Sequence, residues 1–181
     1  MSFSASCALA TLLLWGRPPP EPPSREVLHA EVLRLLEQGG ELPREQEWLP
    51  LGPEALPELV GLAADPQAPE PRRLRAVAAL AVVAHDDAPR RLEGLVRDAT
   101  VPDALRAAAM EALGRRAGLA AVPPLRPLLG DPREEVRAAA AQALGHLGGP
   151  EAREALERQL AQERSSRVRE SLQQALSYLE P

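Results

Sequence analysis

One short motif recurs along the chain from residue 74 onward, and it constrains the fold more than any other feature of the sequence. Each copy joins a Leu or Val to an Arg and continues mainly with small residues. The four copies begin Leu74-Arg75, Leu105-Arg106, Val136-Arg137 and Val168-Arg169. Their Arg residues are 31, 31 and 32 positions apart. A fixed period of this size predicts a repeat array.

Each copy places apolar residues at the spacing of one face of an α-helix. Ala stands six positions after the Arg in every copy, so a neighbouring helix can approach closely. A second, shorter apolar helix follows in the same register, since Leu125 and Leu156 are also 31 residues apart. One such helix pair cannot bury both of its apolar faces, whereas stacked pairs can. The sequence therefore predicts an all-α, right-handed α-solenoid of helix-turn-helix repeats.

The repeat register also predicts the organisation of the whole chain. The expected units are 65–98, 99–130 and 131–161, with a C-terminal half-repeat at 162–180. Ahead of them, residues 24–64 are expected to form N-terminal capping helices, over Ser24–Gln38 and from about Pro53 to Ala64. Trp48, between these two helices, is predicted to plug the end of the array. Residues 1–23 are an apolar segment followed by a Pro-rich spacer.

Turn signals fall between the expected helices. Asp131 followed by Pro132, with Glu134 three positions after Asp131, is typical of a helix N-terminus. Ser165 or Ser166 would cap the last helix. The glycines predicted to end the first helices of the units are Gly114, Gly118, Gly145, Gly148 and Gly149.

The unit from Pro123 to Gly145 resembles a HEAT repeat, and more narrowly the short HEAT-like repeats of the phycobiliprotein (PBS) lyase type. Asp131 comes eight residues after Pro123, and Arg137 comes six after Asp131, as in that family. The resemblance implies that Asp131 and Arg137 form part of a structural ladder that links adjacent units. The other units keep the Arg, but their Asp is shifted or replaced. The same repeat serves many roles, so it predicts the fold rather than the function.

Composition excludes several classes of function. All 21 basic residues are Arg, which excludes a Schiff-base lysine and a phosphate-loop lysine. The net charge of −5 disfavours a general nucleic-acid binder. Aromatic residues make up only 2% of the chain, which argues against a flat pigment pocket. Cys7 stands alone, so an internal disulfide and a Cys metal cluster are excluded.

None of the three histidines predicts a metal or catalytic centre. His29 has no partner at metal-ligand spacing, His85 belongs to a polar turn, and His146 follows a glycine near a helix end. A relative built from similar repeats, deoxyhypusine hydroxylase, binds iron through His-Glu pairs, and this chain has no His-Glu dipeptide. We therefore expect no catalytic residue, no metal and no cofactor.

The predicted function is a non-catalytic scaffold or adaptor that binds another protein. Its partner-binding residues are expected on the second helices, which we predict to line the concave face. These candidates are Arg90, Glu93, Arg97, Arg126, Arg153 and Glu157. A phycobilin-lyase-like chromophore-binding enzyme, or a subunit of one, is an alternative. The Arg pairs Arg72-Arg73, Arg90-Arg91 and Arg115-Arg116 are expected to form a solvated rim, with a binding patch for an acidic protein or a phosphate as the alternative.

A third possibility concerns the amino end. Residues 3–15 are apolar and uncharged, and their length matches the core of a secretory signal. They are too few to cross a bilayer as a helix, and no basic segment precedes them. We expect a cytoplasmic protein, with an exported or membrane-tethered binding module as the alternative.

Overall fold

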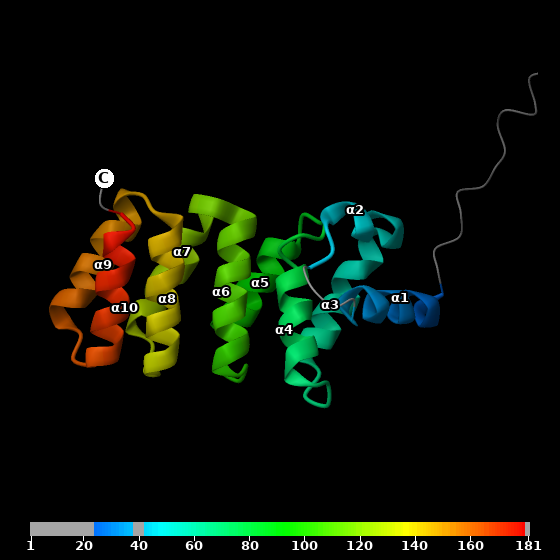
Figure 1. Cartoon of the computed structure of the whole chain (residues 1–181), viewed down its shortest axis with the longest axis horizontal. Helices are drawn as coiled ribbons and strands as arrows, with labels where there is room; N and C mark the ends of the chain where they lie inside the picture. The colour runs from blue at the N-terminus through cyan, green and yellow to red at the C-terminus, as the bar shows by residue number, and fades with distance from the viewer. Residues whose placement is uncertain (1–23, 38–41, 180–181) are drawn as a thin grey trace, which may run out of the picture.

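The computed structural model describes residues 24–37 and 42–179. All regular elements in these two ranges are helical, so the predicted all-α solenoid is confirmed there. Figure 1 shows the elements following one another along a row, from α1 and α2 at one end to α9 and α10 at the other.

The helices of the array form two layers. The first-helix layer holds the four Leu/Val-Arg helices, α4 (Glu70–Ala79), α6 (Asp103–Ala117), α8 (Glu134–Leu147) and α10 (Ser166–Ser177). The second-helix layer holds α3 (Ala55–Ala64), α5 (Ala88–Arg97), α7 (Val122–Leu125) with η3 (Arg126–Gly130), and α9 (Pro150–Gln162). A short η2 (Gly118–Ala121) leads from α6 into α7. In Figure 1 the first-helix layer faces the viewer, with its helices running nearly parallel.

Each second helix packs mainly on the first helix that follows it. α5 packs on α6, η3 on α8, and α9 on α10. By contact, therefore, a unit begins with a second helix and ends with a first helix. The predicted units instead pair each first helix with the second helix that follows it. The sequence period does not distinguish these two pairings, because it is the same whichever helix is counted first.

The N-terminal cap consists of α1 (Arg25–Glu37), α2 (Glu45–Trp48) and η1 (Leu49–Glu54), followed by α3. α1 packs against α3 and α4. Trp48 is 1% exposed, and its indole N–H donates to the carbonyl oxygen of Pro43 at 3.2 Å. Burial of Trp48 at this end of the array is thus confirmed.

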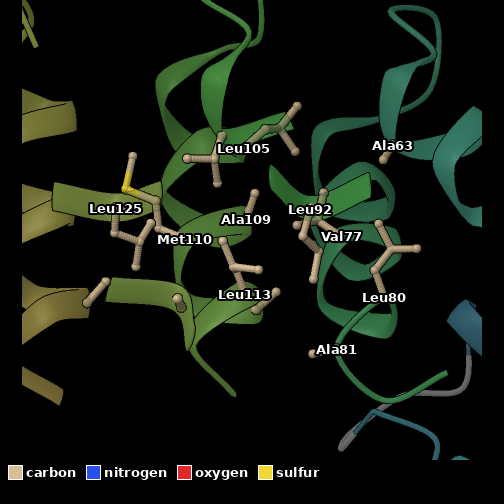
Figure 2. Close-up of a cluster of buried hydrophobic side chains, with 14 of the residues drawn as sticks. Ala63, Val77, Leu80, Ala81, Leu92, Leu105, Ala109, Met110, Leu113 and Leu125 are labelled. Carbon is tan, nitrogen blue, oxygen red and sulfur yellow. The ribbon is translucent and has the colours of Figure 1, made fainter. Parts of the chain in front are cut away.

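The core continues from unit to unit without a break. Figure 2 shows Leu92, Leu105 and Leu113 between α5 and α6, and Met110 on the other side of α6, beside Leu125 of α7. All five side chains are fully buried. Because Leu, Val and Ala fill nearly all of this space, neighbouring helices share one close-packed interior, and the array is expected to move as a rigid body.

Two of the predicted helix ends are wrong. Gly118 and Gly148 do end α6 and α8, with positive φ angles of 55° and 75° that glycine adopts without strain. Gly114 and Gly145, however, lie inside these helices. At Gly145 the lack of a side chain allows close contact with the neighbouring helix, as described below.

The predicted N-caps have mixed outcomes. The hydroxyl of Ser165 accepts the backbone N–H of Val168 at 3.5 Å, so this cap is confirmed. Asp131 does not cap α8, because that helix begins at Glu134 with Arg133 as its N-cap residue. Its carboxylate instead closes the turn before the helix.

Candidate functional site

A carboxylate closes each turn between a second helix and the first helix after it. The four residues are Asp65, Asp98, Asp131 and Glu163, at the C-caps of α3, α5, η3 and α9. Each accepts the backbone N–H two residues further on, at 2.8 to 3.0 Å. They are 33, 33 and 32 residues apart, so the sequence does carry this signal. This recurrence is hard to recognise in the sequence, because the number of residues between the carboxylate and the motif Arg varies from unit to unit.

Two of these carboxylates bind an Arg of the unit before them. The Arg106 Nη2 lies 2.9 Å from Oδ2 of Asp131, and its Nε donates to the carbonyl oxygen of Val96 at 2.9 Å. Arg137 holds Glu163 with two hydrogen bonds, of 2.8 and 3.0 Å. These bonds link successive units in the manner of a ladder.

The predicted ladder residues, Asp131 and Arg137, therefore both make structural contacts, but through different partners. Arg137 donates to the main-chain oxygen of Asp131 at 2.9 Å, while its charge is paired with Glu163. Glu163 takes the place of Asp in the last unit. Arg169 continues the pattern, with hydrogen bonds to the carbonyl oxygens of Leu160 and Glu163.

The ladder predicts an acid-sensitive contribution to stability. Hydrogen bonds from Arg137 hold the pKa of Glu163 to about 2, against an ordinary value of 4.5, although burial acts to raise it. A carboxyl with a depressed folded-state pKa stabilises the fold above its unfolded pKa and loses that effect as pH falls toward the folded value. The shift corresponds to about 3 kcal/mol.

We therefore expect Glu163→Gln to lower the free energy of unfolding at pH 7. The difference in this free energy between the variant and wild type should shrink as pH falls from about 5 to 2. Urea unfolding of both proteins across this range measures the difference. Glu170→Gln, at an exposed position of α10, is the control and should have little effect at any pH. A Glu163→Gln difference that stays constant between pH 7 and pH 2.5 would contradict the assignment.

The predicted partner-binding residues all lie on the second-helix layer. Arg90, Arg97, Arg126 and Glu157 are exposed, and Glu93 and Arg153 are half-buried. Several are already paired along their own helix. Arg97 lies 3.0 Å from Glu93, and Arg153 lies 3.9 Å from Glu157. Arg153 also donates to the carbonyl oxygen of Leu179. The layer therefore presents spaced and largely compensated charges.

Contacts within each layer identify the inner side of the array. α4, α6, α8 and α10 pack against one another in succession. In the second-helix layer α9 meets η3, but direct contact between α3 and α5, or between α5 and α7, is slight. An array curves toward the layer whose members are closer together. The first-helix layer is therefore the inner one, contrary to the prediction that second helices line the concave face.

Two adjoining hollows form a groove on this inner layer, between α6 and α8. Their volumes are about 320 and 250 Å³, and Glu111, Ala143 and His146 line both. Small or flexible residues such as Ala108, Ala139 and Met110 make up much of the remaining wall. We call this feature the α6–α8 groove.

The groove exists because α6 and α8 are held apart by a side chain. A Cβ on Gly145 of α8 would lie 2.8 Å from the Cα of Ala175, so α8 and α10 meet backbone to backbone. A Cβ on Gly114, the equivalent position of α6, would meet only the side chain of Leu147, at 3.5 Å. Leu147 thus fills part of the α6–α8 junction, and the part that it does not fill stays open as the groove.

Polar and aromatic side chains border the groove. Arg115 pairs with Glu111 at 2.6 Å on α6. On the other side, the ring of His146 stacks on Tyr178, with ring centroids 5.2 Å apart. Gln174 donates to the Tyr178 hydroxyl at 2.9 Å. Tyr178 is half exposed and lies next to the groove through its contact with His146. Sequence reasoning did not find the groove, because its opening depends on the spacing between helices.

The other histidines make local contacts. His29 is hydrogen-bonded to Glu58 across α1 and α3. His85 accepts the N–H of Asp87 at 3.0 Å within the predicted polar turn. Among residues 24–37 and 42–179, no three His, Cys, Asp or Glu side chains are grouped to hold a metal ion.

The same two ranges contain no helix with the length and apolarity needed to cross a membrane. Residues 3–15, Cys7 and the Pro-rich spacer lie outside the described residues.

The family comparison matches residues 88–177 to a model described as HEAT repeats. These residues are similar to HEAT repeats. The matched HEAT region begins at the first residue of α5 and ends at the last residue of α10. It therefore covers three successive pairs of a second helix and the first helix after it. The description does not separate the PBS lyase type from other HEAT repeats.

Solved structures similar to the chain include human deoxyhypusine hydroxylase in complex with glycerol. That likeness has a TM-score of 0.56 and 28% identity, and covers 68% of this chain and 42% of the hydroxylase. The chain thus spans less than half the length of that enzyme. Escherichia coli YibA is also similar, with a TM-score of 0.36, 19% identity, and coverage of 90% of this chain and 77% of YibA. No curated protein matches the sequence significantly.

Proposed function

We propose that the chain is a non-catalytic scaffold that uses its HEAT repeats to bind another protein. The observation that carries this proposal is the α6–α8 groove. It lies on the inner layer of the array and is lined in part by small residues, and one of its lining residues, His146, stacks on the half-exposed ring of Tyr178. An aromatic ring and a recess of this kind are common anchoring features of protein interfaces.

The second-helix layer, with its spaced charges, is the alternative partner-binding surface. They remain a prediction for partner contact, acting through electrostatic steering of association. Their intrahelical pairing reduces what each exposed charge can add, because surface ion pairs contribute on the order of 0–1 kcal/mol.

The test is affinity capture of the tagged full chain from source-cell lysate, read by mass spectrometry and by an absorbance scan. We expect one protein at stoichiometric amount, without colour. Capture should survive the double change Arg126→Glu with Glu157→Arg if the groove is the interface, and should be lost if the second-helix layer is. Visible absorbance without a protein partner would replace the scaffold with a chromophore-binding, lyase-like role.

The same preparation tests the export alternative. Mass spectrometry of the natural protein reports its first residue. A natural chain that begins shortly after Gly16 would indicate removal of the apolar segment, and hence an exported binding module.

A further inference from the structure

We infer that the chain pairs with a second copy of itself, edge to edge, through an exposed apolar patch at the turn between α6 and α7. This edge patch consists of Gly118, Leu119 and Ala120 of η2, together with Gly149 and Pro150 of the turn between α8 and α9. A two-fold axis close to Leu119 relates the two copies, which run in opposite directions along the shared edge.

The turns that lead from first helices to second helices lie along one edge of the array, the upper edge in Figure 1. Their order along this edge is the α4–α5 turn, the α6–α7 turn and the α8–α9 turn. Residues 117–125, in and around the α6–α7 turn, carry no charge, whereas the α4–α5 turn contains His85, Asp86 and Asp87. The middle of this edge is therefore apolar.

Leu119 projects from the middle of the edge. It is 62% exposed, more than any other large apolar side chain in the part of the chain that the structure describes. It precedes the buried Leu125 by six residues, and the equivalent positions in the neighbouring units are Asp86 and Pro150. The repeat therefore requires no apolar side chain at this position, and Leu119 is free to make a contact outside its own chain.

A hollow of about 370 Å³ lies beside Leu119. Ala120 and Val122 line it from the α6–α7 turn, and Gly148 and Pro150 line it from the α8–α9 turn. A projecting Leu next to a hollow is self-complementary, because a two-fold rotation places each Leu119 opposite the hollow of the other copy. The hollow shares no lining residue with the α6–α8 groove, so this pairing uses a separate surface.

The unpaired charges on the two sides of Leu119 differ in sign. Toward the α4–α5 turn, Arg116 donates to the carbonyl oxygen of His85 at 3.3 Å, and no carboxylate of the described residues pairs with it. Asp86, in the same turn, offsets part of this positive charge. Toward the α8–α9 turn, Glu151 lines the hollow and forms no ion pair within residues 24–37 and 42–179.

A two-fold rotation exchanges these two sides. Arg116 of each copy then faces Glu151 of the other, so that unlike charges meet on both flanks of the edge patch. An arrangement in which the two copies ran in the same direction would place like charges together. The distribution of charge therefore favours a second copy in the antiparallel orientation.

The contact is small. Three successive turns span roughly 20 Å of edge, since packed helices lie about 8–10 Å apart. Interfaces of this size are typical of weak, reversible association. We therefore expect a monomer–dimer equilibrium in the micromolar range rather than a permanent dimer. Pairing gives the scaffold two copies of each binding surface, which strengthens attachment to a partner that is itself repeated.

Sedimentation velocity of the full chain, at concentrations from about 2 to 200 µM, measures the pairing. We expect wild type to pass from monomer to dimer within this range. Leu119→Glu places a charge in the contact and should leave the chain monomeric throughout. Leu49→Glu is the matched control, because Leu49 is 58% exposed but belongs to η1 in the N-terminal cap, and this variant should dimerise as wild type does. Thermal unfolding confirms that each variant is folded.

Charge exchange tests the two-fold arrangement itself. Arg116→Glu and Glu151→Arg each set like charges against one another, and each should weaken pairing about ten-fold or more. The double variant restores unlike pairs across the axis, and its affinity should return to within about three-fold of wild type.

A wild-type chain that stays monomeric at about 200 µM would overturn the inference. Loss of a captured lysate protein in Leu119→Glu would then assign the edge patch to that protein. A dimer that persists in Leu119→Glu would also overturn the inference, and so would a double charge variant that pairs no better than the single ones.

Discussion

Arg106→Met should destabilise the chain by about 3–5 kcal/mol, the largest effect expected for any single ladder residue. The Arg106 side chain is 2% exposed and holds Asp131 and the carbonyl oxygen of Val96. Burial acts to raise the pKa of Asp131, but hydrogen bonds from the Arg133 N–H and from Arg106 outweigh it and hold that pKa below its usual value. Without Arg106, Asp131 remains nearly buried, and the ion pair left to it is the longer one with Arg133, at 3.5 Å.

Urea unfolding of the full chain measures this loss. Arg115→Met is the matched control, because Arg115 is half exposed and pairs with Glu111 within one helix. It should cost no more than about 0.5 kcal/mol. Adding Asp131→Asn to Arg106→Met should recover part of the stability by removing the uncompensated charge. Equal effects of Arg106→Met and Arg115→Met would show that the buried pair does not stabilise the array.

Gly145→Ala should destabilise the chain by about 2–3 kcal/mol, although Ala favours a helix more than Gly does. The new Cβ would lie 2.7 Å from the Cβ and 2.8 Å from the Cα of Ala175. Neither atom can rotate away, so α10 would have to shift as a whole. Chemical denaturation at pH 7 measures the cost.

The equivalent glycine of α6 should respond in the opposite direction. In Gly114→Ala, the Cβ meets a terminal methyl of Leu147 at 3.5 Å, which is ordinary van der Waals contact. The better helix propensity of Ala should then stabilise the chain by up to about 1 kcal/mol. Similar losses at both positions would contradict the assigned difference between the two helix junctions.

The two glycines also show where sequence reasoning reached its limit. Both follow the motif Arg by eight residues, and a glycine near the expected end of a helix predicts that the helix stops there. In the structure the stops are Gly118 and Gly148, where φ is positive. A Gly inside a helix and a Gly that ends one look alike in the sequence, because the neighbouring helix decides between them.

The ladder gives a similar result. The Arg of each unit was evident from its spacing, and so was one carboxylate, Asp131. The pairing of Arg106 with Asp131, and of Arg137 with Glu163, runs between units. A sequence period shows that such residues recur, but not which unit each side chain reaches.

The helices, their order and the stacked architecture follow from the amino-acid sequence, because amphipathic periodicity is a local property that the repeat reproduces in every unit. The α6–α8 groove and the identity of the inner layer do not follow from the sequence pattern. Both depend on how closely successive helices approach. That distance is set by what lies between them, the side chain of Leu147 at one junction and the backbone of Ala175 at the next.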